Sequence, residues 1–327
     1  MNWSGRRVLV TGAGGFIGSH LTEELTRLGA TTRALVHYNA LGSSGWLDSS
    51  AVRDDVEVIA GDICDPDVAR RIMEDVDVVF HLAALIAIPY SYRAPFSYLR
   101  TNAEGTMNLL LAARASNVER FVHTSTSEVY GSAVYVPIDE GHPLQAQSPY
   151  AASKIAADKL AEACHWSFGL PVVTIRPFNT FGPRQSARAV VPTIVAQCLA
   201  GDVVRLGNQW PKRDLNYVSN TVDGFIRGAT APEAVGQTIN LGSGCEVTIG
   251  ELVQMVAKIV GWPVRVEEDG ERKRRQGSEV ERLLAANGLA MTLLGWKPRV
   301  TLEEGLHLTI DWIREHITTY RPGVYTI

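Results

Sequence analysis

Cysteine is scarce in this sequence, and its cysteines stand far apart. The 327 residues include only Cys64, Cys164, Cys198 and Cys245, and no two of them form a Cys-x-x-Cys pair. Zinc sites and disulfide frameworks usually show closely spaced cysteines. The sequence therefore predicts neither of them, and we expect no metal centre.

Long apolar runs are also missing. The longest one, Val78–Pro89, is interrupted by His81, whereas a membrane-spanning helix needs roughly 18 or more apolar residues. The first residues, MNWSGRRVLVTG, lead into a strand-like segment and show no apolar stretch or cleavage site of a signal peptide. We therefore expect a cytoplasmic protein with no membrane partner.

Neither sign of charge dominates. The 31 Lys and Arg side chains face 35 Asp and Glu side chains, which gives a net charge of −4. A nucleic-acid partner is not expected, because its binding usually requires a basic face. Hydrophobic residues at 46% and charged residues at 20% are typical of a globular protein rather than a disordered one.

Short apolar segments alternate with helical patterns in the first half of the chain. Helical patterns cover Phe16–Leu28, Phe96–Ser116 and Tyr150–Phe168. Strands are expected at Arg7–Thr11, Thr32–Val36, Val56–Ala60, Val76–Leu82, Arg120–Thr124 and Pro171–Arg176. This alternation is typical of βαβ units, so the predicted fold class is α/β, with a Rossmann doubly wound parallel sheet.

The pattern changes after Arg176, where prolines and glycines interrupt it. The remainder mixes short strands with helices, at Val190–Ala200, Val203–Leu206, Leu215–Val218, Gln237–Leu241, Ile249–Val260 and Leu302–His316. We expect a Rossmann domain over residues 1–178, to which part of 215–241 returns. A smaller C-terminal α/β substrate lobe would cover residues 179–327.

A glycine-rich turn joins the first predicted strand to the first predicted helix. Gly12, Gly15 and Gly18 stand three residues apart in the segment TGAGGFIG. Such glycines allow a tight turn, a close approach of backbone to pyrophosphate and close packing of helix on sheet, and the helix N-terminus attracts the phosphates. The turn predicts a dinucleotide site.

The end of the second predicted strand lacks the acid that usually binds the adenosine ribose of NAD. It reads Leu35–Asn39, with His37 at the expected position. The choice between NAD and NADP stays open, with a slight tilt towards NADP. Asp62, after the third strand, is placed to meet the adenine; the alternative is that it caps the helix before Pro66.

Tyr150 and Lys154 are four residues apart on a predicted helix and therefore share one face. A nearby ammonium group favours the phenolate, so we expect the pKa of Tyr150 to fall from about 10 towards neutrality. Tyr150 would then act as a general base on a sugar or alcohol hydroxyl.

Hydroxyls and one carboxylate follow the fifth predicted strand, in the segment TSTSEVYG that contains Thr126, Ser127 and Glu128. Ligands bind at the carboxyl ends of strands in such sheets. These side chains would hydrogen-bond a sugar and supply a further acid or base. The alternative for Ser125 is a strand-end hydrogen bond, and the alternative for Glu128 is a solvated loop acid.

With these motifs, the chain resembles the extended short-chain dehydrogenases/reductases that act on nucleotide sugars. The matching segments are TGAGGFIG (11–18), GDI (61–63), HLAA (81–84), TNAEGT (101–106), TSTSEVYG (124–131), YAASK (150–154), RPFNTFGPRQ (176–185) and RDLNYV (213–218). The resemblance implies a seven-stranded Rossmann sheet, a homodimer formed through a four-helix bundle, and tightly bound NAD(P)+ that is regenerated in each turnover. It places the cofactor against Gly12, Gly15, Phe16, Ile17, Gly18, His37, Asp62, Ile63, Leu82, Ala83, Ala84, Asn102, Tyr150 and Lys154.

The residues after the fifth strand bear on the reaction. Within the family, simple 4-epimerases usually lack a carboxylate at the position of Glu128, whereas 4,6-dehydratases carry one. UDP-glucuronate decarboxylases also carry Thr-Ser-Glu, so they remain an alternative, as does 4-epimerisation. Other segments resemble N-acetylglucosamine 4,6-dehydratases of the legionaminic-acid-pathway type, with the base, UDP or GDP, left open.

The resemblance implies a reaction in three stages. Tyr150 takes the proton of the 4-hydroxyl as C4 is oxidised, Glu128 removes the C5 hydrogen, and water leaves from C6 before hydride returns there. Thr126 would bond the 4-oxygen, and Lys154 the nicotinamide ribose. The family's aspartate acid is replaced by Ser127, so the group that protonates the leaving hydroxyl stays open.

The nucleotide-sugar substrate would meet residues of both halves. The resemblance assigns the diphosphate to Asn179 and Arg213, with Tyr90, Arg274 and Arg275 as further contacts. For Arg213 the alternative is an ion pair with a neighbouring acid. His81 is expected to pack beside the cofactor rather than to catalyse, and a non-catalytic NAD(P)-binding protein is the alternative from a different class.

Overall fold

The computed structural model describes residues 2–273, 276–322 and 324. Its main element is a seven-stranded sheet in the order β10-β6-β5-β4-β1-β2-β3, with every neighbouring pair parallel. The strands are β1 (Arg7–Thr11), β2 (Thr31–His37), β3 (Val56–Gly61), β4 (Val78–His81), β5 (Arg120–Thr124), β6 (Val172–Pro177) and β10 (Thr238–Leu241). The predicted doubly wound Rossmann sheet is confirmed, and its order reverses beside β1, where ligands bind in such sheets.

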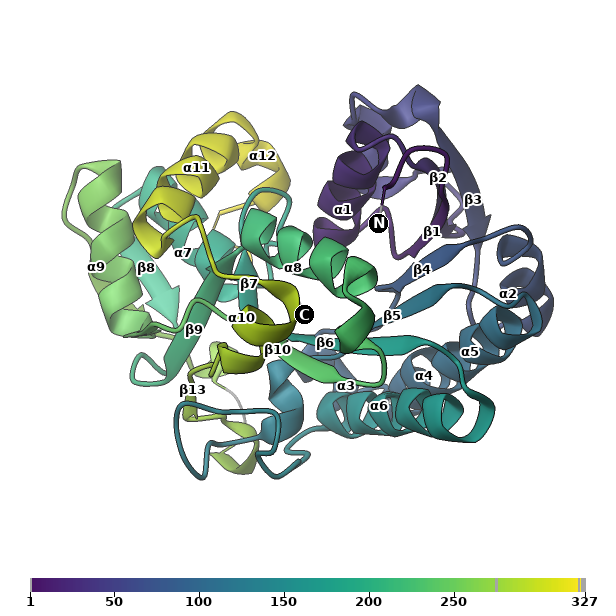
Figure 1. The fold of residues 1–327 in the computed structure, drawn as a ribbon. Helices are drawn as coiled ribbons and strands as arrows, with labels where there is room; N and C mark the ends of the chain where they lie inside the picture. The colour runs from purple at the N-terminus through teal and green to yellow at the C-terminus, as the bar shows by residue number, and fades with distance from the viewer. Residues whose placement is uncertain (1, 274–275, 323, 325–327) are drawn as a thin grey trace.

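Helices cover both faces of this sheet (Figure 1). One face carries α1 (Phe16–Arg27) and α8 (Val218–Thr230), and the other carries α2 (Pro66–Ile72), α5 (Gly105–Ala115) and α6 (Pro149–Phe168). Side chains alternate along each strand, so β1 contributes to both cores. Val8 and Val10 pack with the helix α1 side, and Leu9 packs with the α5 side.

Helix α8 escaped prediction because two glycines interrupt its helical pattern. A Cβ added to Gly224 would come within 2.3 Å of Leu241, and one added to Gly228 would come within 3.0 Å of Ile175. Glycine costs helix stability, but here it lets the helix lie close to β6 and β10. Tertiary packing therefore overrides the local preference.

The predicted helix over 96–116 is divided into three parts. A short helix α4 (Pro95–Tyr98) leads into a π-helical segment, Leu99–Glu104, which is followed by α5. π-helical turns are rare and occur often at functional sites. This one carries Asn102.

The remaining strands and helices form a smaller lobe beside the large sheet. Strand β9 (Lys212–Tyr217) pairs with β7 (Asn179–Phe181), β11 (Glu246–Thr248) and β13 (Arg282–Leu283), and β8 (Val203–Leu206) pairs with β12 (Arg265–Glu268). The helices of this lobe are α7 (Val190–Ala200), α9 (Ile249–Val260), α11 (Leu302–Glu315) and α12 (Ile317–Tyr320), whereas α10 (Gly288–Leu294) packs against β10 and α8 of the large sheet.

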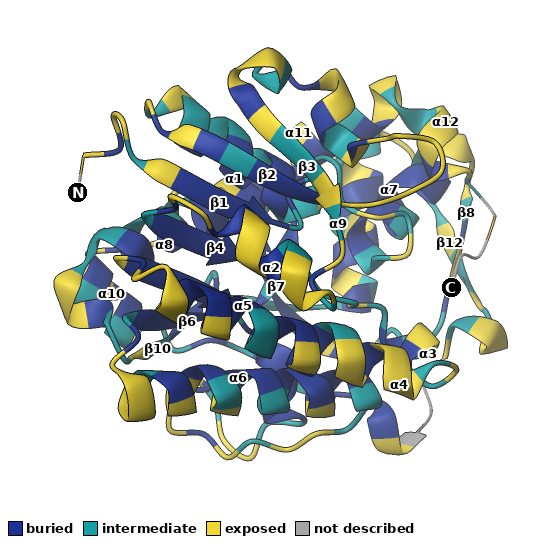
Figure 2. Cartoon of the chain, turned by 90° about the vertical axis from the view of Figure 1, so that its right-hand side faces the viewer, coloured by how far each residue is buried: buried dark blue, intermediate teal, exposed yellow. Residues whose placement is uncertain are grey.

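A continuous apolar core joins the two parts. Phe181, Ile194, Leu252 and Ile310 of the smaller lobe belong to the same buried cluster as Val8 and Ile175 of the large sheet. Figure 2 shows the resulting pattern, with buried strands inside and exposed residues on the outer faces of the helices. Such a core fixes the edge at which the two parts meet.

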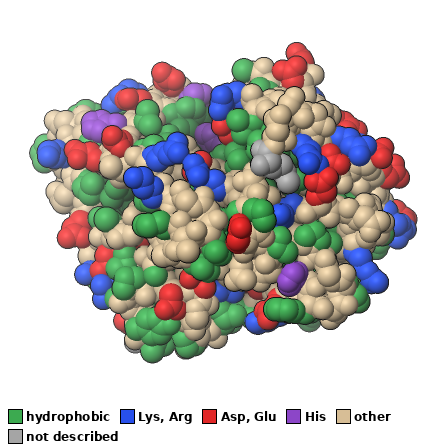
Figure 3. All heavy atoms as spheres, in the orientation of Figure 1, with side chains coloured by type: hydrophobic (Ala, Val, Ile, Leu, Met, Phe, Trp, Pro, Cys, Tyr) green, Lys and Arg blue, Asp and Glu red, His purple; other side chains and the backbone are tan. Residues whose placement is uncertain are grey.

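The surface charge, the apolarity of the helices and the side chains that could bind a metal are not unusual among the described residues. Charged groups of both signs are interspersed over the face in Figure 3. Within residues 2–273, 276–322 and 324, no helix combines the length and apolarity needed to cross a membrane. The same residues contain no group of three or more His, Cys, Asp or Glu side chains that could hold a metal ion.

Candidate active site

The glycine-rich turn forms a narrow cradle between β1 and α1. Gly12 has φ of 71°, and a Cβ on it would lie 2.8 Å from the amide nitrogen of Ala83. A Cβ on Gly18 would lie 2.1 Å from the Gly12 carbonyl oxygen. Among the described residues no side chain caps the first turn of α1 after Gly15, so its amides are available to an anion. The cradle fits the pyrophosphate of a dinucleotide.

Phe16 and Ile17 are the first residues of helix α1, and they pack against the apolar core that contains Val8 and Val10. The loop after β2 then lies against the turn, since the Trp46 amide donates to the Gly14 carbonyl at 3.0 Å. His37 is exposed at the end of β2, and its Nδ1 lies 2.8 Å from the Tyr38 carbonyl oxygen. Asn39 bonds the backbone of this loop through both side-chain atoms.

The ends of β3 and β4 supply the next predicted cofactor residues. Asp62 is exposed and accepts from the Cys64 amide at 2.9 Å, whereas Asp65 is the residue that caps α2. Ile63 is buried, and its carbonyl accepts from Asn108 at 3.0 Å. The alternative of a helix cap at Asp62 is therefore wrong.

The HLAA segment is held by hydroxyl groups. Thr11 Oγ1 accepts from the amides of Leu82 and Ala83 at 3.2 and 3.1 Å, and it also lies 2.8 Å from His81 Nδ1. His81 Nε2 lies 2.9 Å from Thr106 Oγ1, and burial holds the pKa of this imidazole well below its usual value. His81 therefore links β1, β4 and α5 as a neutral structural group, and Ala84 continues this strand end.

Asn102 ties the π-helical segment to the same edge. Its Oδ1 accepts from the Leu85 amide at 2.8 Å, while its Nδ2 donates to the Leu85 carbonyl and to Ser153 Oγ, both at 2.9 Å. Ser153 Oγ donates in turn to the Tyr150 carbonyl at 2.7 Å. Asn102 thus fixes the loop after β4 relative to the helix that carries Tyr150.

The five predicted catalytic residues come from two neighbouring segments. Thr126, Ser127 and Glu128 begin a 3₁₀ turn after β5, where Thr126 Oγ1 accepts from the Glu128 amide at 3.2 Å. Tyr150 and Lys154 lie in the first turns of α6, which contacts this 3₁₀ turn. The Thr126 side chain hydrogen-bonds Tyr150, and the charge of Glu128 is close enough to act on it. Ser127 and Glu128 are both buried.

The expected fall in the pKa of Tyr150 is not found. Burial raises the pKa of its phenol, the neighbouring Glu128 charge adds to the rise, and the hydrogen bond with Thr126 only partly offsets it. Lys154 Nζ instead donates to the Thr124 carbonyl at 2.6 Å. The amine is thus occupied by the strand end, and the phenol stays protonated in this structure.

Two further tyrosines, Tyr98 and Tyr90, form a row of rings with Tyr150. The Tyr98 ring meets the Tyr150 ring edge-on, with centroids 6.2 Å apart, and Tyr98 lies equally far from Tyr90. Tyr90, which the sequence assigned to the substrate, is 41% exposed on α3 (Ile88–Ser91). Its ring is therefore accessible, and Tyr98 separates it from Tyr150.

The predicted diphosphate residues lie on adjacent strands of the smaller lobe. Asn179 on β7 pairs in register with Leu215, two residues beyond Arg213 on β9, so both side chains share one face of the sheet. The buried Asn179 Oδ1 has no hydrogen-bond partner among the described residues. Arg213 is buried and pairs with Glu279 at 3.4 Å. Arg274 and Arg275 lie outside the described residues.

The sequence analysis missed a buried polar group beneath α6. Asp158, one turn beyond Lys154, contacts His123, Ser125 and Arg176. No motif in the sequence indicated that Asp158 is buried among these partners; its four-residue spacing from Lys154 was the only feature that placed it on the same helix face.

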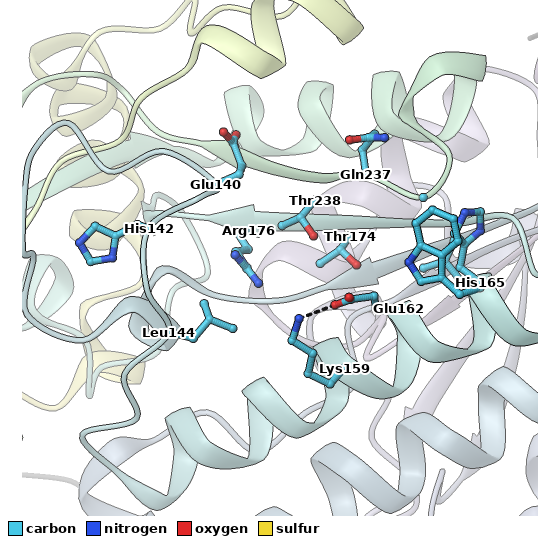
Figure 4. Close-up of a pocket in the computed structure, with 13 residues that line it drawn as sticks. Glu140, His142, Leu144, Lys159, Glu162, His165, Thr174, Arg176, Gln237 and Thr238 are labelled. Carbon is cyan, nitrogen blue, oxygen red and sulfur yellow. Dashed lines mark hydrogen bonds and ion pairs between the residues drawn. The ribbon is translucent and has the colours of Figure 1, made fainter.

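A hollow lies on another side of α6. It is a polar cavity of about 410 Å³ between the end of α6 and the strands β6 and β10, with Lys159, Glu162, Thr174, Arg176 and Thr238 among its lining residues (Figure 4). None of the predicted catalytic residues lines it. The cavity is therefore separate from the predicted catalytic residues, which lie at the end of β5 and the start of α6.

A nucleotide cradle at the switch point, combined with a Tyr-Lys pair and hydroxyl groups at the end of β5, defines an extended short-chain dehydrogenase/reductase. Comparison with known proteins agrees. The family model "GDP-mannose 4,6 dehydratase" matches residues 9–309. The chain therefore belongs to this family of NAD-dependent nucleotide-sugar epimerases and dehydratases.

Individual relatives cover nearly the whole chain. A dTDP-glucose 4,6-dehydratase of Actinoplanes sp. is 34% identical over 320 residues, covering 94% of this chain and 98% of the relative. A UDP-glucose 4-epimerase of Mycolicibacterium smegmatis is 35% identical over 314 residues, with the same coverage. The solved dTDP-glucose 4,6-dehydratase of Streptomyces venezuelae, with NAD bound, has a TM-score of 0.87 at 31% identity, covering 96% of this chain and 99% of that one. Relatives of this chain thus include both dehydratases and epimerases.

Proposed function

We propose that this protein is a nucleotide-sugar 4,6-dehydratase that forms a 4-keto-6-deoxy sugar. The observation that carries the proposal is the buried Glu128 carboxylate, which lies beside Thr126 and Tyr150 at the end of β5. A 4-epimerase needs no additional base, whereas a dehydratase must remove the C5 hydrogen. Two of the relatives described above are 4,6-dehydratases.

The cofactor in this proposal is NAD(P)+, held by the glycine cradle, with Lys154 and Asn102 at the nicotinamide end. When bound, it would accept hydride from C4 and return it to C6. The NAD in the related dehydratase structure and the steric limits at Gly12 and Gly18 support this assignment. Since β2 ends in His37 and not in an acid, NADP remains compatible with the ribose site.

The side chains of the protein divide the proton transfers. Because the phenol of Tyr150 is protonated in this structure, it must first lose its proton to solvent, which the positive charge of a bound NAD(P)+ would favour. As phenolate, Tyr150 then takes the proton of the 4-hydroxyl, and Thr126 bonds the resulting 4-oxygen. The 4-ketone makes the C5 hydrogen acidic, and Glu128 removes it; the hydroxyl at C6 leaves as water with a proton supplied by Glu128 or through Ser127. After hydride returns to C6, a proton taken from solvent is delivered to C5 by Glu128, and the reaction has no net redox change.

The substrate would lie between the two parts of the chain. We propose that residues 1–178, together with part of 215–241, hold the cofactor, and that 179–327 hold the nucleotide. The membership of β10 in the large sheet supports this division. Asn179 and Arg213 would bind the diphosphate, because guanidinium groups bind phosphate oxygens bidentately. The sugar we propose is N-acetylglucosamine, on UDP or GDP.

We also propose a homodimer formed through the outer sides of α5 and α6. Leu111 on α5 and Phe168 at the end of α6 are exposed, as are Phe96 on α4 and Leu99 in the π-helical segment that leads into α5. Exposed apolar side chains on neighbouring helical segments are typical of a subunit interface.

The relatives also favour a second candidate, 4-epimerisation, because an epimerase is 35% identical to this chain. The experiment that separates the two activities is mass spectrometry of UDP-GlcNAc, GDP-GlcNAc, dTDP-glucose and UDP-glucuronate after incubation with the purified protein. Loss of water from one hexose substrate supports the dehydratase. Loss of carbon dioxide from UDP-glucuronate, or an unchanged mass with inverted C4, would replace it by the decarboxylase or the epimerase.

A further inference from the structure

Asp158 is a nearly inaccessible carboxylate that gathers contacts from two strands. His123 on β5 donates from Nε2 to its Oδ1 at 3.0 Å, and Ser125, directly after β5, donates from Oγ to its Oδ2 at 2.7 Å. On β6, Arg176 donates through Nη2 at 2.9 Å and through Nε at 3.2 Å. Only 4% of Asp158 and 5% of Arg176 are exposed. A carboxylate so well satisfied stays ionised, and its pKa is lowered to about 2.

Arg176 is held from both sides. Its Nη1 donates to the Tyr130 hydroxyl at 3.0 Å, and this hydroxyl donates to Asn240 Oδ1 on β10 at 2.8 Å. The guanidinium also lies 5.0 Å from the centre of the Tyr130 ring. Arg176 is therefore a fixed cation between Asp158 and the cavity in Figure 4.

Tyr150, Lys154 and Asp158 follow one another at four-residue spacing on α6, so they form one stripe along the helix. Lys154 is 4% exposed, and the charge of Asp158 acts on it. The other titratable groups at this place are His81 and His123, whose rings lie 5.9 Å apart and whose pKa values burial lowers. The charges packed against the stripe are thus the two cations, Lys154 and Arg176, and the anion Asp158, with Glu128 beside Tyr150 at its other end.

We propose that Asp158 is a positioning residue that keeps Lys154 in its ammonium form and, through Ser125 and His123, fixes the end of β5 to which Lys154 donates. The role of Lys154 in turnover rests on the proposed function, but its charge state does not. Without Asp158, the buried cations Lys154 and Arg176 would lose the carboxylate that balances their charge, and Lys154 would lose its proton first, because arginine remains charged.

The test follows the titration of Lys154 itself. Protein labelled with 13C-lysine is titrated by NMR, and the Lys154→Arg variant assigns the signal of the Lys154 Cε. In the wild type, burial lowers the pKa of Lys154 to about 8. In Asp158→Asn we expect the midpoint to fall by about one pH unit or more, a tenfold change in the protonation constant.

A second variant shifts the midpoint in the opposite direction. Arg176→Met removes the competing cation and leaves Asp158 to Lys154 alone, so the midpoint should rise. Two shifts of opposite sign keep the proposal testable if one variant folds poorly. The matched control is Asp214→Asn, which removes another fully buried carboxylate, bonded to Ser243 and Ala285 in the smaller lobe. That variant should leave the Lys154 midpoint in place.

Turnover gives the second readout. If the protein acts on a sugar of the panel, the alkaline limb of the pH profile of turnover should shift to lower pH in Asp158→Asn, together with the Lys154 midpoint. Asp158→Glu should reverse part of that shift. An unchanged midpoint in both Asp158→Asn and Arg176→Met would overturn the proposal. A protein inactive on every sugar would count against the proposed function only, because the NMR titration needs no substrate.

Discussion

Lys154 Nζ donates a 2.6 Å hydrogen bond to the carbonyl oxygen of Thr124, the last residue of β5. This contact joins the catalytic helix to the strand end that carries Thr126 and Glu128. It also explains why the phenol of Tyr150 gains little from Lys154 in this structure. The ammonium is held by the strand end rather than by the phenol.

Burial of Lys154 should cost stability at neutral pH. The pKa of its amine is about 8 in the folded protein against an ordinary 10.5, so the unfolded chain binds more protons between these pH values. The free energy of unfolding should therefore rise with pH through this window. Lys154→Met should raise the free energy of unfolding at pH 7 by about 1–2 kcal/mol, remove that rise with pH, and abolish turnover. Urea denaturation of the wild type and of Lys154→Met at pH 7 and pH 9.5 measures the free energy of unfolding. A Lys154→Met protein that is less stable than the wild type at pH 7 would contradict the prediction.

Tyr150→Phe should lower kcat by about 10²- to 10⁴-fold and leave the binding of the nucleotide sugar unchanged. The substitution keeps the ring that meets Tyr98 edge-on and removes only the hydroxyl. Steady-state kinetics and substrate titration check it. Tyr135→Phe, which alters an exposed tyrosine bonded to Asp139, is the matched control and should retain full activity. Equal activity of the two variants would disprove the role of Tyr150 as base.

Arg213→Lys should raise KM by about tenfold with little change in kcat, because lysine cannot bind the diphosphate bidentately. Glu279→Gln tests the same contact from the other side. Since Glu279 pairs with Arg213 in this structure, its neutralisation should remove one anion that competes with the diphosphate and tighten the binding of UDP or GDP a few-fold. Calorimetric titration with each nucleoside diphosphate measures this, and weaker binding to Glu279→Gln would show that the pair supports the site rather than competing with it.

Gly18→Ala should weaken NAD(P)+ binding by about tenfold or more, since the new methyl group would lie 2.1 Å from the Gly12 carbonyl and push the turn out of shape. Gly288→Ala adds a methyl group at a position with no atom within 4 Å and serves as the control. Fluorescence titration with NAD+ and NADP+ measures both variants and also compares the two cofactors. If Gly18→Ala binds NAD+ and NADP+ as tightly as the wild type, the glycine-rich turn is not the cofactor site.

The sequence predicted the elements whose signals are local. β1, β5, α7 and α9 have the predicted bounds, because each is a plain apolar run or amphipathic helix between glycines or caps. The glycine turn and the spacing of Tyr150 and Lys154 were likewise visible without the fold. α8 was not, since Gly224 and Gly228 contradict a helix until Leu241 and Ile175 are placed against them.

The electrostatics of the site could not be predicted in the same way. The spacing of Tyr150 and Lys154 gave the correct face of the helix but the wrong direction for the pKa of the phenol, because burial and Glu128 are properties of the assembled site. Asp158 was missed for the same reason. Its partners His123, Ser125 and Arg176 come from two other segments, and only the parallel pairing of β5 with β6 brings them together.

Glu128 is the residue that separates dehydration from epimerisation in this account. Glu128→Gln should abolish loss of water, by about 10³-fold or more, while the isosteric amide keeps the fold. Glu162→Gln, a change to an exposed carboxylate paired with Lys159, is the control and should retain activity. A Glu128→Gln protein that dehydrates as fast as the control would remove this residue from the mechanism.

The most direct measurement is the mass of the sugar product formed by the wild-type protein in D₂O and then returned to ordinary water. Proton removal from C5 and its later replacement from solvent predict a product that has lost one water and gained one deuterium at C5, with none at C6, because that hydrogen comes from C4. A product of unchanged mass and no deuterium, with only C4 inverted, would contradict the account and make the protein an epimerase.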